Sequence, residues 1–266
     1  NVAIGDNALR DQDAGNAYNI AVGYAAGKDI TSGTNNTIVG GLAGDAITTG
    51  ANNTVIGKNA MTSADGSESQ NVAIGVNALE DMNSDENNQN VAVGYRTMAN
   101  LTTGAQNTAI GNEAMGDGVA TGDYNVALGG FAGKTLTSGF YNTIVGSLAG
   151  DALTTGARNV AIGFVALSAE DTGSQNTAVG AYALEALNYD GAAANTAVGY
   201  YAGPAISTGI QNTLLGAFAG DALTTGSNNT AIGFEALSTE DAHSSNTAIG
   251  FQTLKTQDAG ADAYNV

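Results

Sequence analysis

Asn176-Thr177-Ala178-Val179-Gly180 is the stretch that decides the fold, because near-copies of it recur from one end of the chain to the other. Successive copies start 17, 18 or 19 residues apart. A repeat this short and this strict indicates one supersecondary unit stacked on itself. The sequence therefore predicts a solenoid with no single globular core. The other copies start at Asn1, Asn19, Asn36, Asn53, Asn71, Asn90, Asn107, Asn125, Asn142, Asn159, Asn195, Asn212, Asn229 and Asn246.

The alternation of side chains within each copy predicts a short strand. The second residue is always Thr, Val or Ile, and the fourth is always a large aliphatic such as Val179. These two residues share one face of an extended chain, so we expect that face to be the buried one. The third residue is usually Ala but becomes Ile38, Val55, Ile144 or Leu214, which predicts that the opposite face is crowded or covered by a neighbouring chain.

The rest of each coil has two variants. Ala stands three residues after the Gly in nearly every coil. In one variant Leu or Met follows this Ala, as at Leu167; in the other Gly follows it, as at Gly150, and the bulky residue comes three positions later, as at Leu153. Both predict a second inward apolar group and a second short strand or bend. We expect an all-β, parallel β-solenoid (β-roll) of about fifteen coils, because frequent Gly and Thr oppose a helix.

The Ala-Gly coils occur in adjacent pairs, which indicates a higher-order repeat of about four coils. The chain begins in mid-pattern at Asn1, so we expect it to be a piece of a longer protein. We interpret residues 1–266 as a single repeat solenoid. Within it we distinguish a partial block 1–18, a block 19–89, two extra coils 90–124, and the blocks 125–194 and 195–264.

The composition excludes several function classes. The formal net charge is −18 at pH 7, which opposes nucleic-acid binding through phosphate neutralisation. The chain has no Cys, which removes disulfides, thiolate metal sites and thiol catalysis together. No apolar run is long enough to span a bilayer, so we expect no membrane insertion by this segment.

Candidate chemistry is sparse. His243 is the sole histidine and stands in a loop, so no nucleophilic or transition-metal set can be completed around it. We therefore predict no catalytic residue, no cofactor-binding residue and no enzyme activity.

The acidic residues fall mostly between the strands, and their oxygens could hold calcium. The calcium candidates are Asp81, Asp85 and Glu86; Glu170-Asp171 and Glu240-Asp241 form two further pairs at matching positions. Asp45, Asp151 and Asp221 also recur at one place in the Ala-Gly coils. The alternative is a solvated, mutually repelling edge that discourages lateral aggregation, and we expect that reading to hold.

The repeat Asn is expected to form a stacked amide ladder along the solenoid axis. The predicted ladder consists of Asn19, Asn36, Asn53, Asn71, Asn90, Asn107, Asn125, Asn142, Asn159, Asn176, Asn195, Asn212, Asn229 and Asn246. Aromatic residues such as Tyr200 and Phe234 directly follow the repeat Gly, and others such as Tyr201 come one residue later. We interpret them as partly buried between chains, because an uncovered aromatic stripe would be adhesive.

The Asn-Thr-Ala-Ile-Gly repeat with its following Ala resembles the head repeats of YadA-like trimeric autotransporter adhesins. It also resembles the related 17-residue arrays of phage tail fibres and bacterial surface proteins. The resemblance covers essentially the whole chain and implies a left-handed β-roll, packing of three chains into a homotrimer, and an extracellular place on a cell surface or virion. The spacing here is longer than the usual adhesin repeat, and no coiled-coil stalk or membrane anchor is visible.

Three functions follow from these patterns. The first is a non-enzymatic structural or adhesive rod of a surface adhesin or tail fibre, with a host-cell or surface receptor as a further partner. The second is a self-assembling extracellular filament that grows end to end. The third is an ice-binding solenoid, which needs outward ranks of Thr; we rank it below the first because the residue two after each Thr is expected to be core.

Overall fold

The computed structural model describes residues 1–13, 15, 17–64, 66–84, 88–239 and 241–256. By internal contacts the chain divides into two units, residues 1–138 and residues 139–266, and each is described by itself. The first unit contains β1 (Val2–Ile4), β2 (Ile20–Val22), β3 (Thr37–Val39), β4 (Thr54–Ile56), β5 (Val72–Ile74), β6 (Val91–Val93), β7 (Thr108–Ile110) and β8 (Val126–Leu128). The second contains β9 (Thr143–Val145), β10 (Val160–Ile162), β11 (Thr177–Val179), β12 (Thr196–Val198), β13 (Thr213–Leu215), β14 (Thr230–Ile232) and β15 (Thr247–Ile249).

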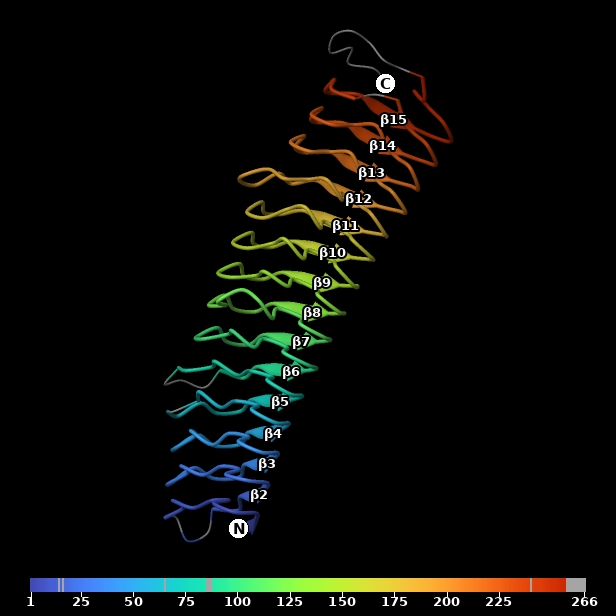
Figure 1. The fold of residues 1–266 in the computed structure, drawn as a ribbon. Coiled ribbons are helices and arrows are strands. Elements are labelled where there is room, and N and C mark those ends of the chain that lie inside the picture. Colours follow the sequence, from blue (N-terminus) through green and yellow to red (C-terminus); the bar gives the residue numbers. More distant parts are fainter. Residues whose placement is uncertain (14, 16, 65, 85–87, 240, 257–266) are drawn as a thin grey trace. The chain divides into compact units, whose positions relative to one another are not determined.

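Each strand pairs in parallel with the strand of the next coil, in register. Thr177 of β11 lies opposite Thr196 of β12, and Ala178 lies opposite Ala197. Equal positions of successive coils therefore stack in columns, and Figure 1 shows the strands of each unit one beyond the next. This confirms the predicted parallel β-solenoid with one short strand per coil.

The predicted burial of the strand faces is wrong, because the two faces are inverted. Counting the repeat Asn as position 1, the side chain at position 3 is fully buried in almost every coil, as at Ala178 and Ile144. Positions 2 and 4 point outward: Ile249 is 63% exposed and Leu215 is 47% exposed. The reason is the narrowness of the coil, since the inner face of each strand meets the rest of the same turn and in most coils leaves room for little more than a methyl group.

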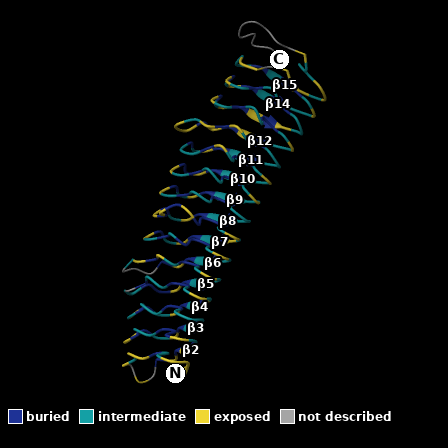
Figure 2. Cartoon of the chain, viewed as in Figure 1, coloured by how far each residue is buried: buried dark blue, intermediate teal, exposed yellow. Residues whose placement is uncertain are grey.

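The interior of each coil is completed by positions 8, 9 and 12. In the coil that begins at Asn176 these are Ala183, Leu184 and Leu187, and all three are fully buried. The predicted second inward apolar group is therefore present. Figure 2 shows the buried residues along the inside of each unit and exposed residues at the outer ends of the coils.

The two coil variants differ in which side chains fill the interior of the coil. Where position 3 is Ile or Leu, at Ile38, Ile144 and Leu214, position 9 is Gly in that coil and in the coil before it. A Cβ added to Gly27 would lie 3.0 Å from Cδ1 of Ile38, and one added to Gly203 would lie 2.5 Å from Cδ1 of Leu214. Paired Ala-Gly coils therefore make room for one bulky inward side chain. This pattern is present in the sequence, but it can be interpreted only once position 3 is known to point inward.

Turns, and not a second strand, return the described part of each coil to the next Asn. Isolated bridges such as Ser174 with Ala192 are the only further β pairings among the described residues. The Gly at position 5 cannot be replaced by a larger residue: Gly180 has φ 137°, and a Cβ there would lie 2.2 Å from the carbonyl oxygen of Gly199. The Gly column therefore sets the close approach of successive coils.

Candidate functional site

The outward strand face is the most regular surface of the molecule. Positions 2 and 4 of all fifteen strands carry only Thr, Val, Ile or Leu and no charged residue, although the chain has a net charge of −18. In the second unit, position 2 is Thr in every strand from β11 to β15, and the in-register strand pairing keeps these threonines in line. From β11 to β15 the face thus consists of two uncharged columns, one hydroxyl-bearing and one aliphatic.

An aromatic column follows the aliphatic column in the second unit. Neighbouring ring centroids lie 4.6–6.4 Å apart. Phe251 is 70% exposed, and Phe164, Tyr200 and Phe234 are also exposed. The rings lean on one another along the solenoid axis and extend the apolar character of the strand face. The column consists of Phe164, Tyr182, Tyr200, Tyr201, Phe218, Phe234 and Phe251.

The repeat asparagines form a buried column of hydrogen bonds. Oδ1 of Asn159 accepts the backbone N–H of Asn176 at 2.9 Å, and its Nδ2 donates to the carbonyl oxygen of Gly173 at 2.8 Å. The backbone N–H of Asn159 in turn donates to Oδ1 of Asn142 at 2.9 Å. The same link, from backbone N–H to the side chain one coil before, recurs at 2.8–3.1 Å within both units. The expected ladder thus joins side chain to backbone as well as amide to amide.

The calcium candidates do not form a site in the described part of the chain. Asp81 is exposed, while Asp85 and Glu86 lie outside the described residues. No group of three or more His, Cys, Asp or Glu among the described residues is placed to hold a metal ion. Nothing in the described geometry therefore supports a calcium role for Asp81.

The prediction of a solvated acidic edge is wrong for several carboxylates. Glu170 is fully buried, and burial raises the pKa of its carboxyl. Burial likewise raises the pKa of Asp45 and of Asp221, each of which has a buried Oδ1 without a hydrogen-bond partner. The sequence signal was available, because Glu170 stands 17 residues after the core residue Leu153. Glu240, its counterpart in the sequence, lies outside the described residues.

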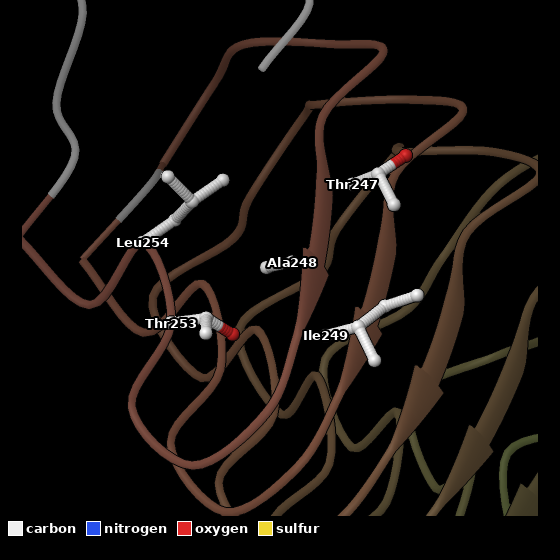
Figure 3. Close-up of a pocket in the computed structure, with 5 residues that line it drawn as sticks. All are labelled: Thr247, Ala248, Ile249, Thr253 and Leu254. Atoms are coloured by element: carbon white, nitrogen blue, oxygen red, sulfur yellow. The ribbon is translucent and has the colours of Figure 1, made fainter. Parts of the chain in front are cut away.

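Neither His243 nor the apolar hollow on the coil of β15 brings reactive groups together. His243 is half-buried, and its backbone carbonyl accepts Nδ2 of Asn229 at 3.0 Å. A cavity of about 280 Å³ lies on the coil of β15 between Ala248, Thr253 and Leu254 (Figure 3). In the other described coils the next coil covers the equivalent residues, whereas the residues that follow this coil, 257–266, lie outside the described part.

Comparison with protein-family models, with curated proteins and with solved structures yields no match. Among the residues that the structure describes, no helix has the length and apolar character needed to cross a membrane. Function must therefore be argued from the surfaces of the solenoid itself.

Proposed function

We propose that this chain is a non-enzymatic structural segment of an extracellular fibre or surface adhesin, in which the outward strand face packs against further copies of the same chain. The resemblance to trimeric adhesin heads implies three copies and a place on a cell surface or virion. In this proposal a receptor contacts the variable loops between the strands, because the residues at the repeated positions build the solenoid itself.

The observation that carries this proposal is the uncharged face at positions 2 and 4, whose side chains are partly exposed in most strands and fully exposed in some. A monomer that kept a net charge of −18 for solubility would be expected to place some of its charge on so large a surface. A contiguous apolar face without charge is typical of a surface that is covered by a protein partner. The aromatic column of the second unit enlarges that face.

The mechanical role follows from the hydrogen bonding. Every coil inside a unit donates and accepts backbone hydrogen bonds with both neighbouring coils, and the asparagine column adds a buried bond per coil. Such a stack resists bending and extension because distortion breaks several bonds in each coil at once. Stiffness and regular display of loops are what a fibre segment must provide.

Chain mass in solution tests the proposal. We expect sedimentation velocity to give a stable trimer at low micromolar concentration. Leu215→Lys combined with Ile232→Lys, which places two charges on the outward face, should convert the trimer into monomers without loss of the β circular-dichroism spectrum. A matched control, Gln211→Lys, adds charge at an exposed position off this face and should leave the mass unchanged.

Two results would overturn the proposal. A monomer at every concentration would remove the copy-to-copy contact, and concentration-dependent growth without limit would favour end-to-end filament assembly.

Ice binding is a second candidate, favoured by the column of outward threonines in β11–β15. Ice binding ranks lower from the sequence because the residue at position 4 is expected to be buried. In the structure position 4 points outward, so this reason does not hold. A face with hydroxyl and methyl groups in register from coil to coil could order water. Thermal hysteresis of a monomeric protein, lost in Thr213→Lys, would support ice binding over fibre assembly.

A further inference from the structure

Glu170 occupies an unusual place in the core. It stands at position 12, where the coils before and after it carry Leu153 and Leu187, and all three side chains are fully buried. A carboxyl group in an aliphatic column costs free energy unless it has hydrogen-bond partners. Its partners therefore indicate what it does.

The carboxyl of Glu170 joins its own turn to the loop 188–192 of the next coil. One oxygen, Oε1, accepts the backbone N–H of Gly173 at 2.7 Å, and Oε2 accepts the backbone N–H of Tyr189 at 3.4 Å. The loop is further held by Oγ1 of Thr172, which donates to Oδ1 of Asp190 at 2.6 Å, and by the N–H of Ser174, which donates to the carbonyl of Gly191 at 2.8 Å. Glu170 is the only buried side chain in this set of contacts.

The same device occurs at a second place. The loop 188–192 belongs to a coil whose next Asn follows 19 residues later, and the coil that begins at Asn71 has the same length. The preceding coil there contains Glu68, which is also fully buried and accepts the N–H of Ser84 at 3.0 Å. Ser84 and Tyr189 both stand 13 residues after their repeat Asn. A buried Glu thus accompanies each of these two enlarged coils.

We infer that Glu170 is a pH-dependent latch on the loop 188–192: the protonated carboxyl favours the closed loop, and the ionised carboxyl favours opening to water. The titratable groups around it are Asp171 on its own turn and Tyr189 and Asp190 on the loop, while the same position in the coils on either side carries the buried Leu153 and Leu187. None of these groups supplies a positive charge to offset the carboxylate.

The direction of the effect follows from burial, which raises the pKa of Glu170 more than the N–H donors of Gly173 and Tyr189 lower it. The closed loop therefore binds a proton more tightly than the open loop. Its stabilisation is complete below the pKa of the open form and is lost as the pH rises through the higher pKa of the closed form.

Hydrogen exchange read by mass spectrometry between pH 5 and pH 8 tests the latch, with wild type compared with Glu170→Gln at each pH so that chemical exchange cancels. In peptides that cover 170–176 and 186–194, the ratio of wild-type to variant exchange should rise with pH. The rise should be about tenfold for each pKa unit between the closed and open forms. Peptides of distant coils should give a constant ratio.

Two further variants keep the inference falsifiable. Glu170→Leu matches the neighbouring core residues, so it should fold and should remove the pH dependence while leaving Tyr189 less protected than in Glu170→Gln. Asp190→Asn removes a loop charge but keeps the buried carboxyl, so it should retain the wild-type profile. Equal pH profiles in wild type and Glu170→Gln, or a flat profile in wild type, would overturn the latch.

Discussion

At the scale of single residues, the coil depends on backbone conformations that most side chains avoid. Gln175, Tyr182 and Leu184 all have positive φ, at 65°, 60° and 50°. Each such residue costs about 1–2 kcal/mol relative to the right-handed region. Hydrogen bonds to neighbouring coils offset the cost: the N–H of Tyr182 donates to the carbonyl of Phe164 at 3.0 Å, and that of Leu184 donates to Ala202 at 3.1 Å. A single coil is therefore not expected to hold this shape without its neighbours.

The asparagine column gives a prediction at this scale. Asn159→Ala removes the acceptor for the N–H of Asn176 and the donor for the carbonyl of Gly173, and both groups are buried. Each orphaned group costs about 1–3 kcal/mol, so we expect a loss of about 2–6 kcal/mol in the free energy of unfolding by urea titration. Gln175→Ala, at an exposed neighbouring position, should change it by less than about 0.5 kcal/mol. Unchanged unfolding in Asn159→Ala would show that the column is not a stabilising element.

At the scale of the coil, stability rests on matched volumes across a narrow interior. Position 3 and position 9 share one space: most coils carry Ala at 3 with Leu or Met at 9, whereas Ile or Leu at 3 occurs with Gly at 9 in the same coil and in the coil before it. The coil from Asn176 has Ala178 with Leu184, and the coil from Asn142 has Ile144 with Gly150. In both arrangements the residues that fill the interior are fully buried.

A double-mutant cycle tests this exchange of volume. Gly150→Leu alone should overpack the coil against Ile144, whose nearest atom would lie 3.5 Å from the added Cβ, at a cost of about 1–3 kcal/mol. Ile144→Ala alone should leave a cavity and cost about 2–5 kcal/mol. The double variant copies the coil from Asn176, so thermal unfolding should show it to be more stable than either single variant. Additive losses would contradict the shared space.

At the scale of the whole molecule, charge opposes folding at neutral pH. The chain carries 25 acidic residues against 7 Lys and Arg. Burial raises the pKa of Glu170, Asp45 and Asp221, so each of these carboxyls binds a proton more tightly in the folded state. Their contribution to stability is present below the unfolded pKa and is lost as pH rises through the folded pKa. Exposed pairs such as Arg10 with Asp11 act in the opposite direction but contribute little at a solvated surface.

We therefore expect the melting temperature to be higher near pH 5 than at pH 8 in low salt. Calorimetry across this range checks the expectation. Added salt should raise the melting temperature at pH 8 by screening self-repulsion, but it should not close the gap, because buried carboxyls are screened less than exposed ones. A melting temperature that peaks at neutral pH would contradict this account.

The sequence by itself determined the architecture. A strict Asn-Thr-Ala-Val-Gly repeat predicts short parallel strands in register, because equal residues 17–19 apart can stack only coil on coil. It also located the strands, the turn glycines and the asparagine column. These are periodic features, and periodicity is visible in the chain alone.

Only the tertiary structure decided which face of each strand lies inside. Alternation defines two faces but does not say which one the rest of the coil will cover, and side-chain size favoured the wrong one. The return path of the chain carries Ala183, Leu184 and Leu187 across the inner face, so only a small residue fits at Ala178 and the larger Val179 turns outward. The burial of Glu170 has the same origin, because its position in the coil, and not its polarity, places it in the core.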